Sequence, residues 1–253
     1  MPDDPAGHGG PDEPSDPGQP AGPGSPGQPA GPDEPAGPGG PGQPERPAQP
    51  GRPAQPDQSG GGIELAELFG RNAPLVLEIG SGMGDVTAAM AAADPDRDYL
   101  AVEVHTPGIA NLLAMVERRG LRNVRVADGD ALVLLRHVIP PGAFAAINIF
   151  FPDPWPKARH HKRRLIQPAH VPLLRDRLAP GGRLHCATDL PDYAYAMRET
   201  LTADPELVNA YPGFAPRPDR PVTKFERRAR AAHRAVYDLI FERKGPVPGG
   251  TPS

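Results

Sequence analysis

Two features of the sequence predict an α/β fold with a mostly parallel sheet covered by helices on both faces. Short apolar runs alternate with segments of helical periodicity between Leu75 and Leu201, which is the pattern of strands joined by crossover helices. Carboxylates stand at the ends of five of the apolar runs. Ligands bind such sheets at the carboxyl ends of the strands, so these acids predict one site there: Glu78, Glu103, Asp130, Asp153 and Asp189.

The expected elements follow one another regularly. Strands are expected at residues 75–79, 99–104, 123–127, 144–151 and 183–187. Helices are expected at residues 63–69, 85–92, 107–119, about 131–137, 168–178 and 192–201. Pro107 suits the start of its helix, where a missing N–H costs nothing, and Pro180-Gly181-Gly182 predicts a turn. The segment 211–243 is expected to supply a strand pair that closes one edge of the sheet.

The composition predicts one folded domain between two tails. Residues 1–62 are mostly Pro, Gly, Ala, Asp and Gln, and they cannot bury enough apolar surface to offset chain entropy, so we expect disorder there. Residues 63–244 form the domain, and 245–253 a short disordered tail. The first tail has nine acids and two bases, a balance of −7, so the rest of the −4 chain carries +3. A basic domain suits an anionic partner.

Several classes of protein are disfavoured by composition. The only cysteine, Cys186, permits neither an internal disulfide nor a cysteine-based metal site, and suits a reducing cytoplasm. No apolar run reaches membrane-spanning length. The pair His160-His161 lacks the spacing of metal ligands on a helix. We therefore expect a cytoplasmic protein with no metal and no membrane partner, and the sequence leaves monomer and homodimer equally open.

A proline-rich segment from Phe151 to Leu165 is the most unusual stretch. Three prolines in five residues forbid helix and sheet, so a stiff loop is expected to carry Asp153 and the only tryptophan. A dense basic run follows. A fixed carboxylate beside a basic run indicates chemistry on a polyanion, although a solvated surface turn is the alternative. The cations expected to bind phosphates are Lys157, Arg159, Lys162, Arg163 and Arg164.

The glycine loop after the first strand indicates a nucleotide cofactor. The spacing is Gly80-x-Gly82-x-Gly84, and glycines let the backbone approach a ligand closely. Glu78 would repel a pyrophosphate, which disfavours a dinucleotide-dependent oxidoreductase, but it suits the amino group and sulfonium of S-adenosylmethionine. Glu103 lies where an acid accepts hydrogen bonds from ribose hydroxyls, and Asp130 where one can accept from an adenine amino group.

Several blocks of the sequence resemble one known family. They are Phe150 to Arg164, Arg220 to Glu226, Leu77 to Gly84, Val102 to His105, Asp130-Ala131, and Ala187 to Asp189 with Tyr193. On these blocks, the chain resembles the bacterial tRNA (guanine-N7-)-methyltransferases of the TrmB type. The resemblance covers about residues 63–244. The resemblance implies a Rossmann-like fold, S-adenosylmethionine as cofactor, and methylation of guanosine 46 in the variable loop of tRNA to 7-methylguanosine.

The same resemblance implies roles for individual residues. It implies cofactor contacts at Glu78, Glu103, Asp130 and Asp153, beside the loop glycines Gly80 and Gly82, with Asp153 as the catalytic residue. It implies tRNA contacts at Lys157, Asp189, Thr223, Lys224, Phe225 and Glu226. Two departures stand out. The family's basic Gly-Arg segment has only Gly51-Arg52 as a counterpart, and alanines at 229 and 232 replace usual glycines, which predicts a differently shaped turn.

The chemistry expected for such an enzyme depends on positioning. Guanine N7 has a free lone pair and no proton to lose, so no strong base is needed. Holding N7 in line with the methyl–sulfonium bond can supply roughly 7–11 kcal/mol. Asp153, helped by Asp189, is expected to stabilise positive charge on the guanine. Two alternatives remain open: a methyltransferase of another RNA, and a non-catalytic RNA-binding protein on the same scaffold.

Overall fold

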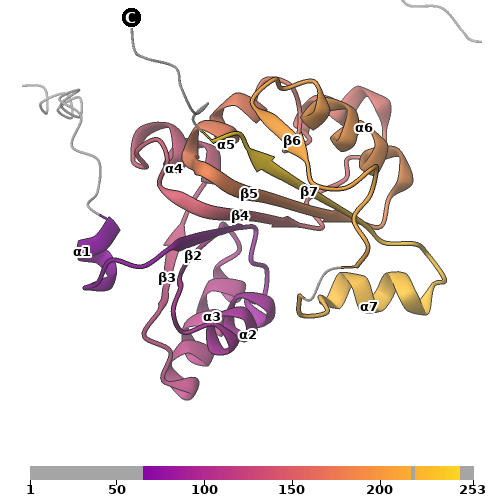
Figure 1. Ribbon diagram of the computed structural model, residues 1–253. Coiled ribbons are helices and arrows are strands. Elements are labelled where there is room, and N and C mark those ends of the chain that lie inside the picture. Colours follow the sequence, from indigo (N-terminus) through magenta and orange to yellow (C-terminus); the bar gives the residue numbers. More distant parts are fainter. Residues whose placement is uncertain (1–64, 218–219, 246–253) are drawn as a thin grey trace, which may run out of the picture. The chain divides into compact units, whose positions relative to one another are not determined.

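The computed structural model describes residues 65–217 and 220–245. The predicted tails, apart from Gly245, lie outside these residues, as do Gly51-Arg52. The described residues form a seven-stranded sheet of order β3-β2-β1-β4-β5-β7-β6 (Figure 1). Five strands run parallel, and β7 is antiparallel to both of its neighbours, which confirms a mostly parallel sheet. The strands are β1 (Leu75–Ile79), β2 (Asp98–Glu103), β3 (Val124–Asp128), β4 (Phe144–Phe150), β5 (Leu178–Thr188), β6 (Leu207–Asn209) and β7 (Tyr237–Arg243).

Helices cover both faces of the sheet, as the sequence predicts. Alternate residues of β1 point to opposite faces: Leu75, Leu77 and Ile79 join the core beneath α4, α5 and α6, whereas Val76 packs with Ala91 of α2. Glu78 shares the face of Val76 and therefore points towards α2. The helices are α1 (Leu65–Phe69), α2 (Asp85–Ala93), α3 (Thr106–Arg119), α4 (Ala131–His137), α5 (Val171–Arg177), α6 (Pro191–Thr202), α7 (Lys224–Ala231) and the 3-10 helix η1 (Ala158–Arg163).

Most elements begin and end within a few residues of their predicted bounds, but the last part of the chain differs. Only one strand of the pair expected in residues 211–243 lies there, namely β7. The prediction is wrong for its partner at the sheet edge, β6, which precedes Tyr211. Residues 224–231 form the unpredicted helix α7. Ala229 is fully buried within that helix, and the left-handed conformation falls on His233, with φ of 53°. Alanine at 229 is therefore compatible with the observed backbone.

Strand β5 also begins earlier than predicted. Leu178 pairs with Phe144, and the register shifts before Arg183 pairs with Ala146. The predicted turn at residues 180–182 is therefore an irregularity inside the strand. Gly181 takes a φ of +77°, which a side chain would resist.

A buried ionic network fastens α7 to the edge of the sheet. Arg220 lies 2.6 Å from Glu226 of α7 and 2.9 Å from Asp238 of β7, and all three side chains are at most 4% exposed. Asp238 also lies 2.8 Å from His185 of β5. Burial alone would raise the pKa of Glu226, but hydrogen bonds from Arg217 and Arg220 hold that pKa below its ordinary value. The network therefore holds its charges by mutual pairing.

We expect Arg220→Ala to lower the free energy of unfolding by roughly 3–5 kcal/mol, because Glu226 and Asp238 would stay buried without their shared counter-charge. Chemical denaturation followed by circular dichroism measures this loss. Arg230→Ala is the matched control: Arg230 contacts the same Glu226 but its side chain is 52% exposed, so about 1 kcal/mol or less is expected. Equal losses in the two variants would contradict the argument from burial.

Candidate functional site

The glycine loop between β1 and α2 is shaped by close packing. The N–H of Gly80 donates to the carbonyl of Val102 at 2.8 Å, which holds the loop against β2. A Cβ at Gly108 of α3 would lie 2.0 Å from the carbonyl oxygen of Gly82, and a Cβ at Gly84 would lie 2.5 Å from Leu112. Gly84 also has a φ of +79°. Helix α3 can therefore approach the loop only because these positions lack side chains.

Glu103 ties the glycine loop to the start of α3. Its carboxylate accepts hydrogen bonds from the N–H groups of Gly82 at 2.6 Å, Val104 at 2.8 Å and His105 at 2.9 Å. The side chain lies at the carboxyl end of β2, where the sequence placed it. Three backbone donors fix its orientation, so Glu103 faces the glycine loop in one geometry.

Glu78 is a buried carboxylate with no cationic partner among the described residues. It is 3% exposed, and the hydroxyl of Thr87 donates to its Oε2. Burial raises the pKa of Glu78 to about 7. The hydrogen bond from Thr87 opposes this rise, and the negative charge of Glu103 adds to it. A buried carboxylate without a counter-ion is costly. It therefore suits a ligand that brings a positive charge.

A small cavity of about 40 Å³ joins the glycine loop to the C-terminal segment. Ser81 Oγ is buried there without a hydrogen-bond partner. An orphaned hydroxyl beside an unpaired carboxylate fits the polar, cationic end of S-adenosylmethionine, so the residues present suit the cofactor predicted from the sequence. The lining includes Glu78, Gly80, Ser81, Gly82, Phe150, Thr223, Lys224 and Phe225.

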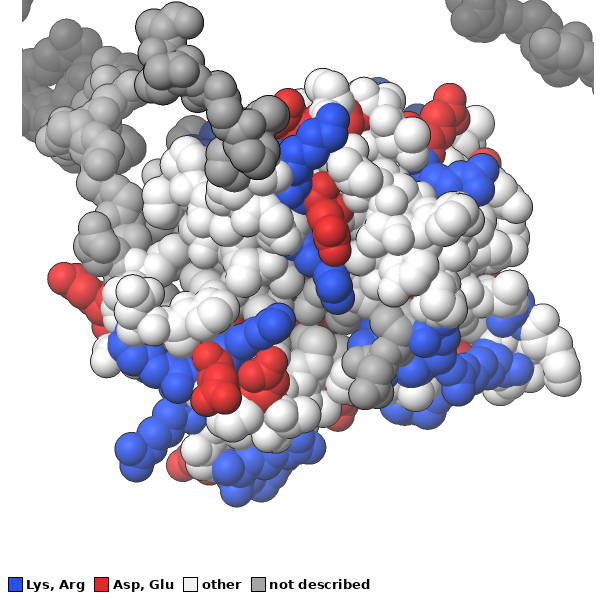
Figure 2. All heavy atoms as spheres, viewed as in Figure 1, with Lys and Arg blue, Asp and Glu red and all other residues white. Residues whose placement is uncertain are grey.

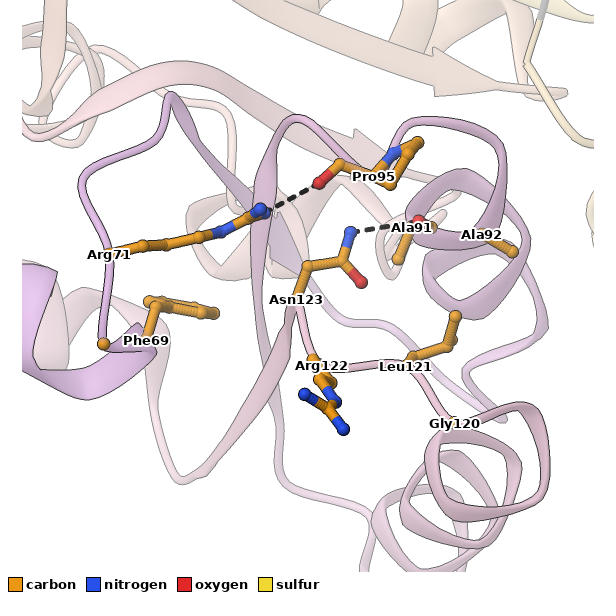
Figure 3. A pocket seen from close by; sticks show the side chains of 10 residues that line it. Phe69, Arg71, Ala91, Ala92, Pro95, Gly120, Leu121, Arg122 and Asn123 are labelled. Atoms are coloured by element: carbon orange, nitrogen blue, oxygen red, sulfur yellow. Dashed lines mark hydrogen bonds between the residues drawn. The ribbon is translucent and has the colours of Figure 1, made fainter.

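A much larger cavity lies elsewhere, near the starts of β2 and β3, and contains none of the predicted site residues. It measures about 440 Å³ and is lined by Phe69, Arg71, Leu121 and Asn123 among others (Figure 3). The amide of Asn123 donates to the carbonyl of Ala91 at 3.0 Å, and Arg71 donates to that of Pro95 at 2.8 Å. These polar groups bind the protein itself, and the strand ends with their acids lie at the opposite edge. Size therefore does not mark this cavity as the site.

Arg164 anchors the proline-rich loop from beneath. Its side chain is 4% exposed and donates to the carbonyl of Pro154 at 2.9 Å and to Asp192 at 2.5 Å. Its guanidinium also lies 4.6 Å from the centre of the Tyr193 ring on α6. The prediction that Arg164 binds phosphate is therefore wrong, because its donors are used inside the protein.

The loop also meets the C-terminal segment through two aromatic rings. Phe151, whose φ of 53° lies in the left-handed region, stacks on Phe225 with centroids 6.0 Å apart. Asp153, two residues further on, is exposed. The loop's route from the sheet is thus set by Phe151 before Asp153 and by Arg164 after it.

Exposed cations gather on two helices. The 3-10 helix η1 and the residue before it present Lys157, Arg159, Lys162 and Arg163. The Arg163 guanidinium lies 4.9 Å from the centre of the Trp155 ring. Figure 2 shows the second group, at the lower right, where Figure 1 places α7; it includes Arg227, Arg228 and Arg230. Two basic helices, one of which begins with the cavity residues Lys224 and Phe225, suit a large polyanion.

The remaining predicted residues have protein partners. Asp130 caps α4, with Oδ1 accepting from Leu132 N–H at 2.7 Å. Asp189 pairs with exposed Arg234 at 2.7 Å. Thr223 caps α7 by accepting from the N–H of Glu226 at 2.9 Å, and the Glu226 side chain is fully buried. In the segment 223–226, the more accessible side chains are those of Lys224 and Phe225.

Sequence reasoning did not identify Ser81, Thr87, Arg220 or Arg234 as parts of the site. Thr87 offered a signal, since it is the only hydroxyl residue in the alanine-rich helix α2. Arg234 offered none, because its contact with Asp189 spans 45 residues. Within the described residues, no cluster of His, Cys, Asp and Glu could hold a metal ion, and no helix is long and apolar enough to cross a membrane.

Comparisons with known proteins agree with this geometry. A family model described as "Putative methyltransferase" matches residues 72–239. A tRNA (guanine-N(7)-)-methyltransferase of Streptomyces coelicolor is 55% identical over 194 residues, covering 74% of this chain and 72% of the relative. A protein of the same name from Nitrosospira multiformis is 53% identical over 187 residues, covering 74% and 82%. A solved rRNA methylase from Streptococcus thermophilus has 14% identity and a TM-score of 0.47, covering 68% and 87%, so the argument for a family rests on the sequence matches.

We expect Glu78→Gln to remove a pH-dependent loss of stability. In the wild type the unfolded chain ionises Glu78 near its ordinary pKa of 4.5, while the folded protein retains the proton until about pH 7. The free energy of unfolding therefore falls between these values, nominally by roughly 3 kcal/mol at 1.36 kcal/mol per pKa unit. Urea denaturation at about pH 5 and about pH 8 measures the effect. Relative to wild type, Glu78→Gln should gain stability at the higher pH; an identical pH dependence in both proteins would exclude a buried, titrating Glu78.

Proposed function

The chain belongs to the bacterial tRNA (guanine-N7-)-methyltransferase family, and from this premise we propose that it methylates N7 of guanosine 46 in the tRNA variable loop. The methyl donor is S-adenosylmethionine, which supplies an electrophilic methyl group on a sulfonium. The observation that carries the proposal is the cavity at the glycine loop. Glu78, which has no ion pair among the described residues, lines this cavity together with Lys224 and Phe225, so a predicted cofactor residue and a segment predicted to contact tRNA share one cavity.

The cofactor set follows from the carboxylates and the loop. Glu78 receives the cationic head, and Gly80 and Gly82 present backbone to it. A carboxylate has about four lone-pair sites, so Glu103 can accept a ribose hydroxyl besides its three backbone donors. Asp130 caps α4 through Oδ1, which leaves Oδ2 to accept from the adenine amino group.

Asp153 is the residue we assign to the guanine. Methylation at N7 places positive charge on the ring, and a nearby carboxylate stabilises that charge. Asp153 is exposed on a loop that is fixed by Arg164 and by Phe151, whose ring stacks on the cavity residue Phe225. It can also accept from the guanine N1–H and amino group, which would orient N7 towards the methyl. Asp189 is retained as a proposed tRNA contact, and its ion pair with Arg234 fixes the position of its carboxylate.

The two basic helices are proposed to bind the tRNA backbone. One group is Lys157 with the exposed cations of η1, and the other is Lys224 with the arginines of α7. Phe225 is 41% exposed and offers an aromatic face on which a base can stack. Thr223 and Glu226 contribute by shaping and anchoring α7. Binding through phosphates predicts an affinity that falls steeply with salt.

The deciding experiment is methyl transfer from labelled S-adenosylmethionine to an unmodified tRNA transcript, followed by cleavage at 7-methylguanosine. We expect one cleavage site, at the variable-loop guanosine, and none in a transcript with adenosine at that position. Labelling of other RNAs in preference to tRNA would favour the alternative of another RNA substrate. Cofactor binding without transfer to any RNA would favour a non-catalytic RNA-binding protein.

We expect Asp153→Asn to lower kcat roughly 100-fold, the usual scale for removing one group that stabilises transition-state charge. The cofactor Kd should change little, because the Glu78 cavity is untouched. Single-turnover transfer and isothermal titration calorimetry separate the two effects. Asp96→Asn is the control, since Asp96 is exposed just before β2, at the opposite edge of the sheet. Wild-type turnover in Asp153→Asn would remove Asp153 from the mechanism.

A further inference from the structure

Thr87 is a fully buried polar residue in a helix whose other buried residues, Val86, Ala88 and Ala91, are apolar. Helix α2 reads DVTAAMAAA, and Ala88 and Ala91 fill its buried face at 0% and 1% exposure. Thr87 is 0% exposed, and its hydroxyl donates to Glu78 Oε2. Burying a hydroxyl is costly unless it is hydrogen-bonded. An apolar residue of similar size would fill the same space, so the role of the hydroxyl is to donate a hydrogen bond to the Glu78 carboxylate.

The two oxygens of Glu78 are in different situations. Oε2 accepts the Thr87 hydroxyl, whereas Oε1 has no hydrogen-bond partner among the residues that the structure describes. Glu78 lines the cavity at the glycine loop together with Ser81, whose hydroxyl is also without a partner. One oxygen is thus held by the protein and the other is left for a ligand.

We propose that Thr87 is a positioning residue for the cofactor: by holding Oε2 of Glu78, it keeps Oε1 directed to the cavity where the cationic head of S-adenosylmethionine binds. The inference rests on the proposed function for the identity of that ligand. The contact between Thr87 and Glu78 stands independently, because both residues belong to the described core.

The charges around Glu78 explain why its ionisation needs this support. Glu103 and Tyr99 face it from β2, and Asp85 of α2 and Lys224 at the start of α7 line the same cavity. From β4 the neighbour is the neutral Asn148. Burial raises the pKa of Glu78 to about 7, and the Thr87 hydrogen bond opposes this rise. Without that bond the carboxylate would be protonated over a wider pH range and would lose its attraction for a cation.

The test compares Thr87→Val, which keeps the shape and removes the hydroxyl, with Thr87→Ser, which keeps the hydroxyl. Calorimetric titration with S-adenosylmethionine gives Kd at about pH 6, 7, 8 and 9. Wild-type affinity should weaken as pH falls through 7, because Glu78 becomes protonated. Thr87→Val should bind roughly tenfold more weakly at neutral pH, with a smaller deficit at the highest pH, where Glu78 is ionised in both proteins. Thr87→Ser should stay within about threefold of wild type.

A loss in Thr87→Val that is equal at every pH would overturn the proposal, because it would indicate packing alone. Wild-type affinity in Thr87→Val would overturn it too. If Thr87→Val does not fold, carbon NMR titration of the Glu78 carboxyl in ligand-free wild type and Thr87→Ala supplies the same comparison: the pKa must rise on removing the hydroxyl, and an unchanged pKa overturns the proposal. Wild-type protein that does not bind S-adenosylmethionine at all would instead refute the proposed function.

Discussion

The pairing of Arg220 with Glu226 and Asp238 is the interaction on which the functional edge of this protein depends. Helix α7 has eight residues, and half of its sequence, KFERRARA, is cationic, so it is too short and too highly charged to be stable alone. Its buried residues are a glutamate and an alanine. The helix is therefore held by an ion pair where helices of this size normally rely on an apolar stripe. Because Lys224 and Phe225 open this helix, their place at the glycine-loop cavity depends on Arg220.

A buried arginine also anchors the proline-rich loop. Arg164 is as buried as Arg220, at 4% exposure, and it joins the carbonyl of Pro154 to Asp192 of α6. In both places a buried arginine fixes a segment whose exposed cations suit a polyanion. The partner of Arg164, Asp192, is 64% exposed, so only the Arg220 pairs are buried on both sides. A fully buried pair contributes little net stability, but losing one partner is costly. The arrangement therefore favours a single geometry over a stronger fold.

Sequence reasoning predicted the sheet well and the basic segments poorly, for one physical reason. The strands are apolar runs whose burial can be read directly, and β1 to β4 lie within a residue or so of their predicted bounds. In a basic run, however, phosphate-binding and anchoring residues look alike. Arg163 and Arg164 are adjacent, yet the first is exposed beside Trp155 and the second is buried beneath the loop. Helix α7 was missed because its buried side carries a charge, that of Glu226. The partner of that charge, Arg220, is itself paired with Asp238 of β7, a contact that no local sequence pattern shows.

For the five acids at the strand ends, the sequence predicts a common location but not the environment of each side chain. Their common edge follows from parallel topology, but their environments differ: Glu103 is fixed by backbone donors, Asp130 caps a helix and Asp189 pairs with Arg234. Only tertiary contacts distinguish these roles. Glu78 differs from the other four in that burial raises its pKa, and it forms no ion pair among the described residues. A protein selected for stability alone would neutralise that charge. Its retention at the glycine loop is explained by a ligand that carries the missing positive charge. The exposed cations of η1 and α7, in contrast, lie on the surface, where a nucleic acid can reach them.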